Sequence, residues 1–309
     1  MRPYKKIVVW GERLINGSSH THAYVHAAFF RAYQSLGSEV LWLSDSDDTS
    51  GIDFSQTLFI TEGMGNRLMP IRKDCWYVLH HVDFSRFKDV GYRCLNLKAY
   101  STRNASLSSG LEKITDWERV ASSYDENGFI SKLLVMPWAT HLLPTEIELL
   151  PSCVTNGRRT KSVYWVGSIT DGEMGNVNEI QKMGIALKSL GIEMAYARLT
   201  EGWESRFAAQ ASWIAPAVVG EWQRSVEYLP CRAFKNASYC RVPVTNSDAV
   251  SRMLDNVPPV ARGNYQEAFM KCSEIENSTD AGRHVAEIVK LHHTYLNRID
   301  LIETVFEWR

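Results

Sequence analysis

The chain has 309 residues, a length typical of two domains of about 150 residues each. Hydrophobic residues make up 45% and charged residues 22%, which is typical of a folded globular protein and excludes a disordered chain. The formal charge of −1 gives no sign of a polyanionic partner, so nucleic acid is not an expected ligand. No run of about 18 apolar residues predicts a membrane span, and we expect a soluble, cytoplasmic protein.

The first half of the chain alternates strand-like and helical segments. Residues 5–11 (KKIVVWG) form an apolar run that ends on glycine, and residues 21–37 have helical spacing before a terminal glycine. Residues 38–45 (SEVLWLSD) are the next expected strand, which completes a βαβ unit of the kind that builds parallel sheets. Further strands are expected at residues 56–63, 75–83, 92–100 and in the apolar start of 130–151. We assign residues 1–140 to a first Rossmann-like domain.

The same alternation begins again after a polar break at residues 155–162. Strands are expected at residues 163–168, 192–198, 212–220 and 242–246, and helices at 176–191, 201–210 and 229–240. The sequence therefore predicts an α/β fold with two tandem, doubly wound, Rossmann-like domains that face a cleft, the second at residues 141–280. An amphipathic helical tail at 281–309 is expected to pack back on the first domain.

Six cysteines are scattered along the chain with no CxxC pair, which favours reduced thiols over a disulfide framework or a zinc site. The sequence DSDD at residues 45–48 contains a DxD pattern. We interpret it as a solvated turn and not as a metal site.

Residues 227–247 (EYLPCRAFKNASYCRVPVTNS) place two cations at the expected start of a helix. Arg232 and Lys235 are three residues apart and therefore lie on one helix face. The helix dipole disfavours cations at its N-terminal end by about 0.3–1 kcal/mol, so this position calls for another reason. An anion held by the two side chains and by unpaired backbone N–H groups is such a reason, and solvated surface charges are the alternative.

The chain resembles glycosyltransferases of the GT-B type over nearly its whole length. The resemblance rests on the two βαβ halves, the linker MPWATHLLP (136–144), the strand KSVYWVGS (161–168) and the segment CRAFKNASYCRVPVTNS (231–247). Many of these enzymes have a glutamate that contacts the donor ribose, and the corresponding position here is Asn236. This departure argues against the retaining mechanism of that subgroup. The basic helix start is more similar to the fucosyltransferase and exostosin branches, where basic residues hold the donor diphosphate.

The resemblance implies a glycosyltransferase that moves a hexosyl, pentosyl or deoxyhexosyl group from a nucleotide-diphosphate sugar to a hydroxyl of a glycan or small-molecule acceptor. It implies an inverting mechanism without a metal or other cofactor, in which cationic side chains stabilise the leaving diphosphate. The segment APAVV (215–219) would line the base pocket through its backbone. The expected donor-binding residues are Gly167, Ser168, Arg198, Pro216, Val218, Tyr228, Arg232, Lys235 and Asn236.

The candidates for the catalytic base lie in two loops of the first half that follow strands. The first loop is NGSSHTH (16–22), where His20 is our first choice. Glycine and serine residues precede it and are expected on the acceptor side: Gly17, Ser18 and Ser19. The second is HHVD (80–83), which offers His81 and Asp83. Glu62 and Asp171 remain alternatives.

Three other functions are alternatives to this one. A Rossmann dehydrogenase requires G-x-G-x-x-G after the first strand, but the sequence there is ERLING, and no Walker motif is present. A non-catalytic, two-lobed protein that binds a free sugar would have the same architecture. A transferase that modifies DNA bases is also compatible with the fold, although the net charge argues mildly against it.

Overall fold

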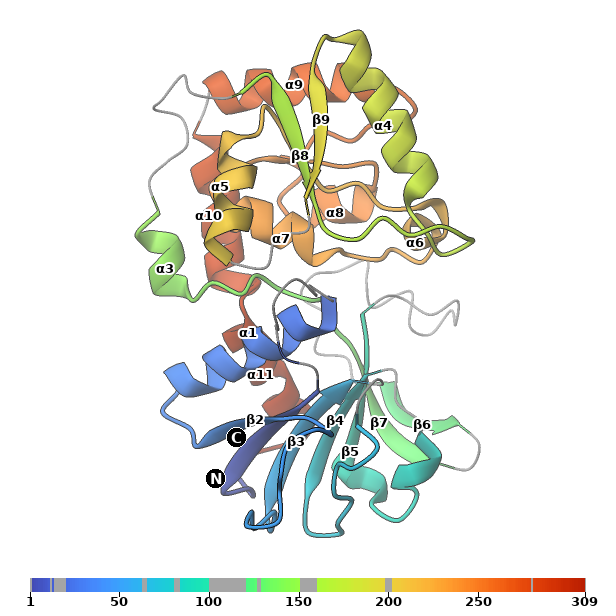
Figure 1. Cartoon of the computed structure of the whole chain (residues 1–309), viewed down its shortest axis with the longest axis vertical. Coiled ribbons are helices and arrows are strands. Elements are labelled where there is room, and N and C mark those ends of the chain that lie inside the picture. The colour runs from blue at the N-terminus through green and yellow to red at the C-terminus, as the bar shows by residue number, and fades with distance from the viewer. Residues whose placement is uncertain are drawn as a thin grey trace. The chain divides into compact units, whose positions relative to one another are not determined.

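The computed structural model describes residues 2–11, 13, 21–62, 66–80, 84–99, 121–126, 129–150, 160–197, 202–278 and 280–308 (Figure 1). The described residues form two compact units. Unit 1 contains those up to Met136 together with those from Tyr295 onward, and unit 2 contains Pro137–Thr294. The division thus lies after Met136, where we expected it after residue 140, and the expected tail is shared between the units.

Unit 1 is built on a single sheet with the strand order β2-β1-β3-β4-β5-β7-β6 (Figure 1). All neighbouring strands pair in parallel except β6 and β7, which form an antiparallel pair. The strand bounds are β1 Lys6–Trp10, β2 Val40–Leu43, β3 Thr57–Glu62, β4 Trp76–His80, β5 Cys94–Lys98, β6 Ala121–Glu126 and β7 Phe129–Val135. Strand β6 has the polar sequence ASSYDE, and we did not expect it because polar edge strands lack the apolar run that marks a central one.

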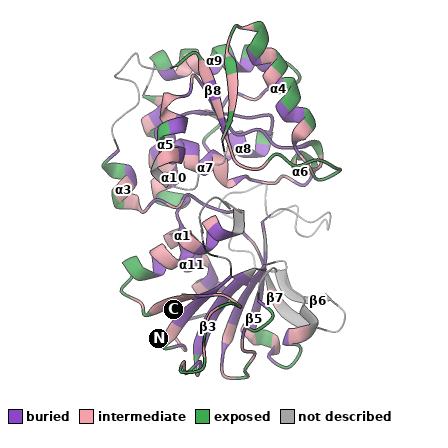
Figure 2. Ribbon diagram, in the orientation of Figure 1, coloured by how far each residue is buried: buried purple, intermediate pink, exposed green. Residues whose placement is uncertain are grey.

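The central strands of this sheet are mostly buried (Figure 2), and consecutive apolar residues along them, which point to opposite faces, are buried. The short 3₁₀ turns η1 (Phe84–Phe87) and η2 (Gly91–Arg93) lie in the connection between β4 and β5. No longer helix is present in the described part of that connection. A buried apolar cluster on the sheet includes Val8, Trp10, Phe59, Tyr77, Leu79 and Phe87.

The C-terminal helix belongs to unit 1, although it follows unit 2 in the sequence. Helix α11 (Tyr295–Val305) packs against α1 (Thr21–Ser35) and against β7. The rings of Tyr295 and Phe29 lie 4.8 Å apart, and the rings of Trp308 and Trp76 lie 5.1 Å apart. Burial of large aromatic side chains therefore ties the end of the chain to its first half.

Unit 2 contains two pairs of parallel strands, β8–β9 and β10–β11. The strand bounds are β8 Ser162–Val166, β9 Glu193–Ala197, β10 Ala215–Pro216 and β11 Pro243–Val244. The last two strands are short, in part because Pro216 and Pro243 have no N–H to donate to a ladder. The helices are α3 Pro144–Glu148, α4 Val177–Ser189, α5 Gly202–Ala211, α6 Glu221–Ser225, α7 Cys231–Ser238, α8 Asp248–Arg252, α9 Tyr265–Ser278 and α10 Ala281–His292.

A fully buried ion pair joins separate elements of unit 2. The guanidinium of Arg241, which is 0% exposed, pairs with both carboxylate oxygens of Glu276 on α9 at 2.9 and 3.0 Å. The guanidinium also donates to backbone carbonyls at the end of α5, including Ser212 O at 2.8 Å, and Glu276 accepts from the N–H of Val242 at 2.8 Å. Every charge in this pair therefore has several partners, which a buried charge requires.

Candidate functional site

The candidate site lies at the carboxyl ends of the strands of unit 2, where β8 ends and α7 begins. The Nε of Arg232 donates to the carbonyl of Val166, the last residue of β8, at 3.0 Å. The guanidinium carbon of Arg232 lies 3.7 Å from the ring centroid of Trp165, a cation–π contact. Gly167 has φ +129°, and a Cβ there would collide with Nη2 of Arg232. Two residues expected to bind the donor, Gly167 and Arg232, are therefore in contact.

Arg232 is a half-buried cation without a carboxylate partner in the described part of the chain. It is the second residue of α7, whose first turn contains no acidic residue. Burial lowers the pKa of the guanidinium, while the neighbouring Cys231 and Tyr228 raise it. An arginine stays protonated in proteins, so this positive charge is available to an anion.

Lys235 occupies a different position from the one expected. Helix α7 starts at Cys231, because Pro230 has an extended backbone conformation, and it ends at Ser238. Lys235 therefore lies in the last turn, where the helix dipole favours a cation. Burial lowers the pKa of its amine. Of the two cations, only Arg232 therefore lies where the helix dipole disfavours a positive charge.

A glycine-containing loop connects β8 to α4 beside Arg232. The buried side chain of Asn176 orders it, because Oδ1 accepts from the N–H of Thr170 at 3.0 Å and Nδ2 donates to the carbonyl of Ser168 at 3.3 Å. Asp171, an alternative catalytic base, is exposed and accepts from the N–H of Gly172 at 2.7 Å, a bond within its own turn. The loop is therefore held in one conformation next to the cation.

The backbone after β10 is largely engaged in internal hydrogen bonds. The N–H of Ala217 donates to Val244 O at 2.7 Å, and its carbonyl accepts from the hydroxyl of Thr245 at 3.1 Å. Asn246 binds both backbone groups of Val219, accepting from N–H at 2.9 Å and donating to the carbonyl at 2.8 Å. We expected the backbone of this segment to bind the nucleotide base of the donor. The N–H and carbonyl groups of Ala217 and Val219, however, are hydrogen-bonded within the protein. Val218 lies between them with its side chain buried.

Asn236 and Pro216, both expected to bind the donor, are bonded to each other. The side-chain Nδ2 of Asn236 donates to the carbonyl of Pro216 at 3.1 Å, and both residues are buried. This bond connects α7 to β10. It therefore supports the orientation of the helix that carries Arg232.

A buried network that the sequence analysis missed stabilises the same region. Oε2 of Glu179, in the first turn of α4, accepts from Nδ2 of Asn246 at 3.1 Å and from the hydroxyl of Tyr265 at 2.7 Å. Burial acts to raise the pKa of Glu179, but hydrogen bonds from Lys182, Tyr265 and Asn246 outweigh it, and the pKa is lowered. The sequence feature that could have indicated this network is the polar pair Thr245-Asn246, which directly follows an apolar strand.

Replacing Asn246 with alanine should lower the free energy of unfolding by about 1–3 kcal/mol, because buried groups of Val219 and Glu179 would lose their partner. Urea denaturation measures this difference. Asn277→Ala is the matched control, since Asn277 is exposed on α9. Equal stability of the two variants would show that the network contributes nothing.

Tyr228 precedes α7 and is half-buried near Arg232. Its N–H donates to Gln223 O at 2.8 Å, and burial raises the pKa of its hydroxyl. Several expected site residues lie outside the described residues: Gly17, Ser18, Ser19, His20, His81, Asp83 and Arg198. The side chain of Glu62, at the end of β3, is likewise not described.

The DSDD sequence forms a turn, as expected, but Asp45 and Asp47 are half-buried and hydrogen-bonded within unit 1, where we expected them to be solvated. Asp45 accepts from the indole N–H of Trp10 at 2.8 Å and from the N–H of Arg67 at 2.7 Å. Asp47 accepts from the N–H of Ser44 at 2.6 Å. Among the described residues, no group of three or more His, Cys, Asp or Glu side chains is placed to hold a metal ion.

Neither a family model nor a curated protein sequence matches the chain. Solved structures do match it over almost its whole length. An alpha-glucosyltransferase (AGT) in complex with UDP has a TM-score of 0.59 and 11% identity, and the match covers 97% of this chain and 99% of that one. The chain has a GT-B-type fold. This result confirms the α/β architecture expected from the sequence.

Two further structures share this fold. One is an alpha-glucosyltransferase in complex with UDP and a 13-mer DNA containing a HMU base, with a TM-score of 0.57, 9% identity and coverage of 98% of this chain and 100% of that chain. The other is the N-terminal domain of trehalose-6-phosphate phosphatase from Candida albicans, with a TM-score of 0.51, 9% identity and 97% coverage of both chains. At these identities the shared property is the fold.

Proposed function

We propose that this protein is a glycosyltransferase that uses a nucleotide-diphosphate sugar as donor. The observation that carries the proposal is the half-buried guanidinium of Arg232, which lies against Gly167 at the carboxyl end of β8 in a GT-B-type fold. In open α/β sheets, ligands bind beyond the carboxyl ends of the strands, at helix N-termini. Arg232 and the first turn of α7 form such a position.

The donor diphosphate is the group that this arrangement suits. Arg232 supplies a positive charge in the first turn of α7. The first N–H groups of a helix generally lack intrahelical partners, although in α7 the N–H of Ala233 donates to the carbonyl of Pro230 at 3.0 Å. The glycine at position 167 lets the guanidinium of Arg232 lie directly against the backbone at the end of β8. Uridine diphosphate is the first nucleotide to test, because it is the ligand in two structures that share the fold.

In the proposed reaction, a base deprotonates the acceptor hydroxyl while the nucleoside diphosphate leaves from the opposite face of the sugar. Arg232 stabilises the charge that develops on the leaving diphosphate, so that no metal is required. This role resembles that of basic residues in fucosyltransferases and exostosins. His20 is the proposed base, with His81 and Asp83 as alternatives.

Two acceptor classes follow from different observations. The sequence suggests a hydroxyl of a glycan or small molecule. A second candidate is a hydroxymethylated base in DNA, because one structure with this fold holds DNA that contains a HMU base. The net charge of −1 led us not to expect nucleic acid, but net charge does not exclude a local basic surface.

A thermal-shift panel with UDP, GDP, ADP, CMP and dTDP tests the donor assignment. A nucleotide at about 100 times its Kd stabilises the folded state by about 2.7 kcal/mol, so one nucleoside diphosphate should raise Tm clearly above the others. A free sugar that raises Tm, with no response to any nucleotide, would instead support a two-lobed binding protein. That result would overturn the proposal.

A further inference from the structure

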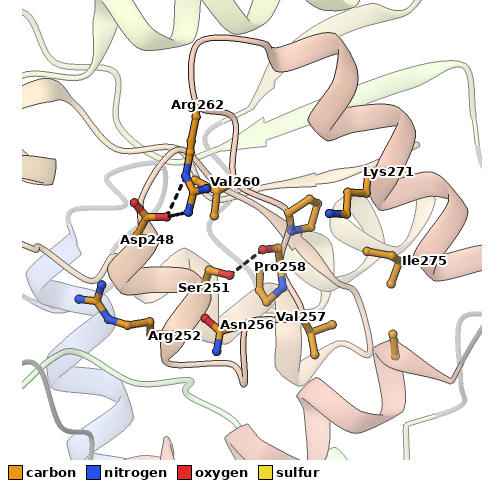
Figure 3. A pocket seen from close by; sticks show the side chains of 12 residues that line it. Asp248, Ser251, Arg252, Asn256, Val257, Pro258, Val260, Arg262, Lys271 and Ile275 are labelled. Carbon is orange, nitrogen blue, oxygen red and sulfur yellow. Dashed lines mark hydrogen bonds and ion pairs between the residues drawn. The ribbon is translucent and has the colours of Figure 1, made fainter.

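A cavity of about 720 Å³ lies in unit 2 beside α8, apart from the residues expected to bind the donor (Figure 3). Its polar lining comes from α8, from the segment that follows α8, and from α9. Figure 3 shows Arg262 reaching toward Asp248 on one side and Lys271 projecting from the helix on the other. The cavity is several times larger than a single phosphate group, so it has room for part of a polymer.

The lining carries more positive than negative charge. Arg252, Arg262 and Lys271 are cationic, and Asp248 is the single carboxylate among the lining residues. With Glu227, which pairs with Arg252 from outside the lining, three positive and two negative charges give a net charge of +1. Lys271 is exposed, and no carboxylate pairs with it in the described ranges. The cavity therefore suits an anion.

The two arginines keep donors for a ligand although each has a carboxylate partner. Arg262 contacts only Oδ1 of Asp248, through Nε and Nη2, and these side chains are 76% and 54% exposed. Arg252 contacts Glu227 through one Nη atom at 2.8 Å. Exposed pairs of this kind contribute about 1 kcal/mol or less, so a phosphate can add to the arginines or displace the carboxylates at low cost.

Part of the cavity wall is a tight turn followed by two prolines. Asp255 and Asn256 both have left-handed backbone conformations, with φ of +55° and +59°, and Pro258 and Pro259 follow them. The hydroxyl of Ser251 on α8 donates to the carbonyl of Pro258 at 2.7 Å (Figure 3). This bond attaches the proline segment to α8, which carries Arg252 at its C-terminal end.

The cavity is connected to the candidate donor site through α8. This helix begins at Asp248, two residues after Asn246, which fixes the backbone after β10. At its other end, Arg252 pairs with Glu227, the neighbour of Tyr228. A ligand in the cavity would therefore lie alongside elements that form the donor site.

We propose that this cavity binds backbone phosphates of a nucleic-acid acceptor, next to the nucleotide that receives the sugar. The inference rests on the proposed function and selects its DNA acceptor. Phosphodiesters are spaced along a strand and suit cations that come from different elements, as Arg252, Arg262 and Lys271 do. Contacts of this kind hold the strand in register without reading its sequence.

Fluorescence anisotropy with a labelled DNA duplex, measured over a range of salt concentrations, tests the proposal. Loss of each phosphate contact should reduce the salt slope, d log K/d log [salt], by about 0.9. Arg262→Gln/Lys271→Gln should therefore bind more weakly than wild type, with a slope reduced by about two. The control is Lys188→Gln, an exposed lysine on α4, which should leave affinity and slope unchanged.

Absence of DNA binding by the wild-type protein, or equal slopes for wild type and the double variant, would overturn the proposal. The two replaced side chains are exposed, and an unchanged Tm verifies that the variant folds. Binding of UDP, followed by thermal shift, should be the same in wild type and double variant. A failure of the donor assignment would appear in that second measurement and is therefore distinguishable.

Discussion

Replacing Arg232 with glutamine is expected to lower kcat for sugar transfer by about 100- to 1000-fold. The guanidinium lies where the diphosphate charge would develop, and removal of one such electrostatic group from an active site has an effect of this size. Glutamine retains the capacity to donate a hydrogen bond but removes the charge. Steady-state kinetics with the nucleotide sugar selected by the thermal-shift panel measures the change.

A second variant displaces the same charge without removing it. In Gly167→Ala the new Cβ would collide with Nη2 of Arg232, and φ of +129° disfavours any side chain. We expect a loss of activity in the same direction as for Arg232→Gln. Lys188→Gln, on the exposed surface of α4, is the control. If Arg232→Gln kept the wild-type rate, this residue would not contact the leaving group and the proposed site would be wrong.

Replacing Glu276 with alanine is expected to lower the free energy of unfolding by about 3–5 kcal/mol. Arg241 would then keep a fully buried charge without its carboxylate, and breaking a buried ion pair by removing one partner has this cost. The N–H of Val242 would also lose its acceptor. Urea denaturation followed by circular dichroism measures the loss.

The double variant Arg241→Met/Glu276→Leu removes both charges and keeps apolar side chains at the two positions. Comparing it with Glu276→Ala shows how much of the lost stability is due to the unpaired charge. Replacement of a whole buried ion pair by apolar residues is often neutral, so the double variant should recover part of the stability that Glu276→Ala loses. Recovery should be incomplete because the carbonyl of Ser212 and other carbonyls near it would lose their donor. A loss below 1 kcal/mol for Glu276→Ala would show that this pair does not stabilise unit 2.

Much of the fold can be predicted from local patterns in the sequence. The β-branched run at Lys6–Trp10 became β1, and the helical spacing after it became α1. The run SVYWV became β8, with Gly167 directly after it. Arg232 was also identified as a candidate site residue from a local pattern, because the helix dipole disfavours a cation in the first turn of a helix.

The site was predicted less completely than the fold, because its residues are assigned by long-range contacts. Asn246 bonds to Val219, 27 positions earlier, and Glu179 accepts from Tyr265, 86 positions later. Sequence periodicity reports which side of an element faces the core, but it does not report which polar partners meet there. For this reason the sequence did not indicate that Asn236 and Pro216, both expected to bind the donor, are hydrogen-bonded to each other.

The sequence by itself determined the alternation of strands and helices in two halves and the cation at position 232. These features depend on hydrophobic periodicity, on glycine and proline, and on helix ends, all of which act over a few residues. Only the tertiary structure decided that the tail divides between the two units after Thr294, that Lys235 lies in the last turn of α7, and that the backbone after β10 is already hydrogen-bonded. These outcomes depend on which distant buried groups satisfy one another's hydrogen bonds and apolar surfaces, a property of the packed chain as a whole.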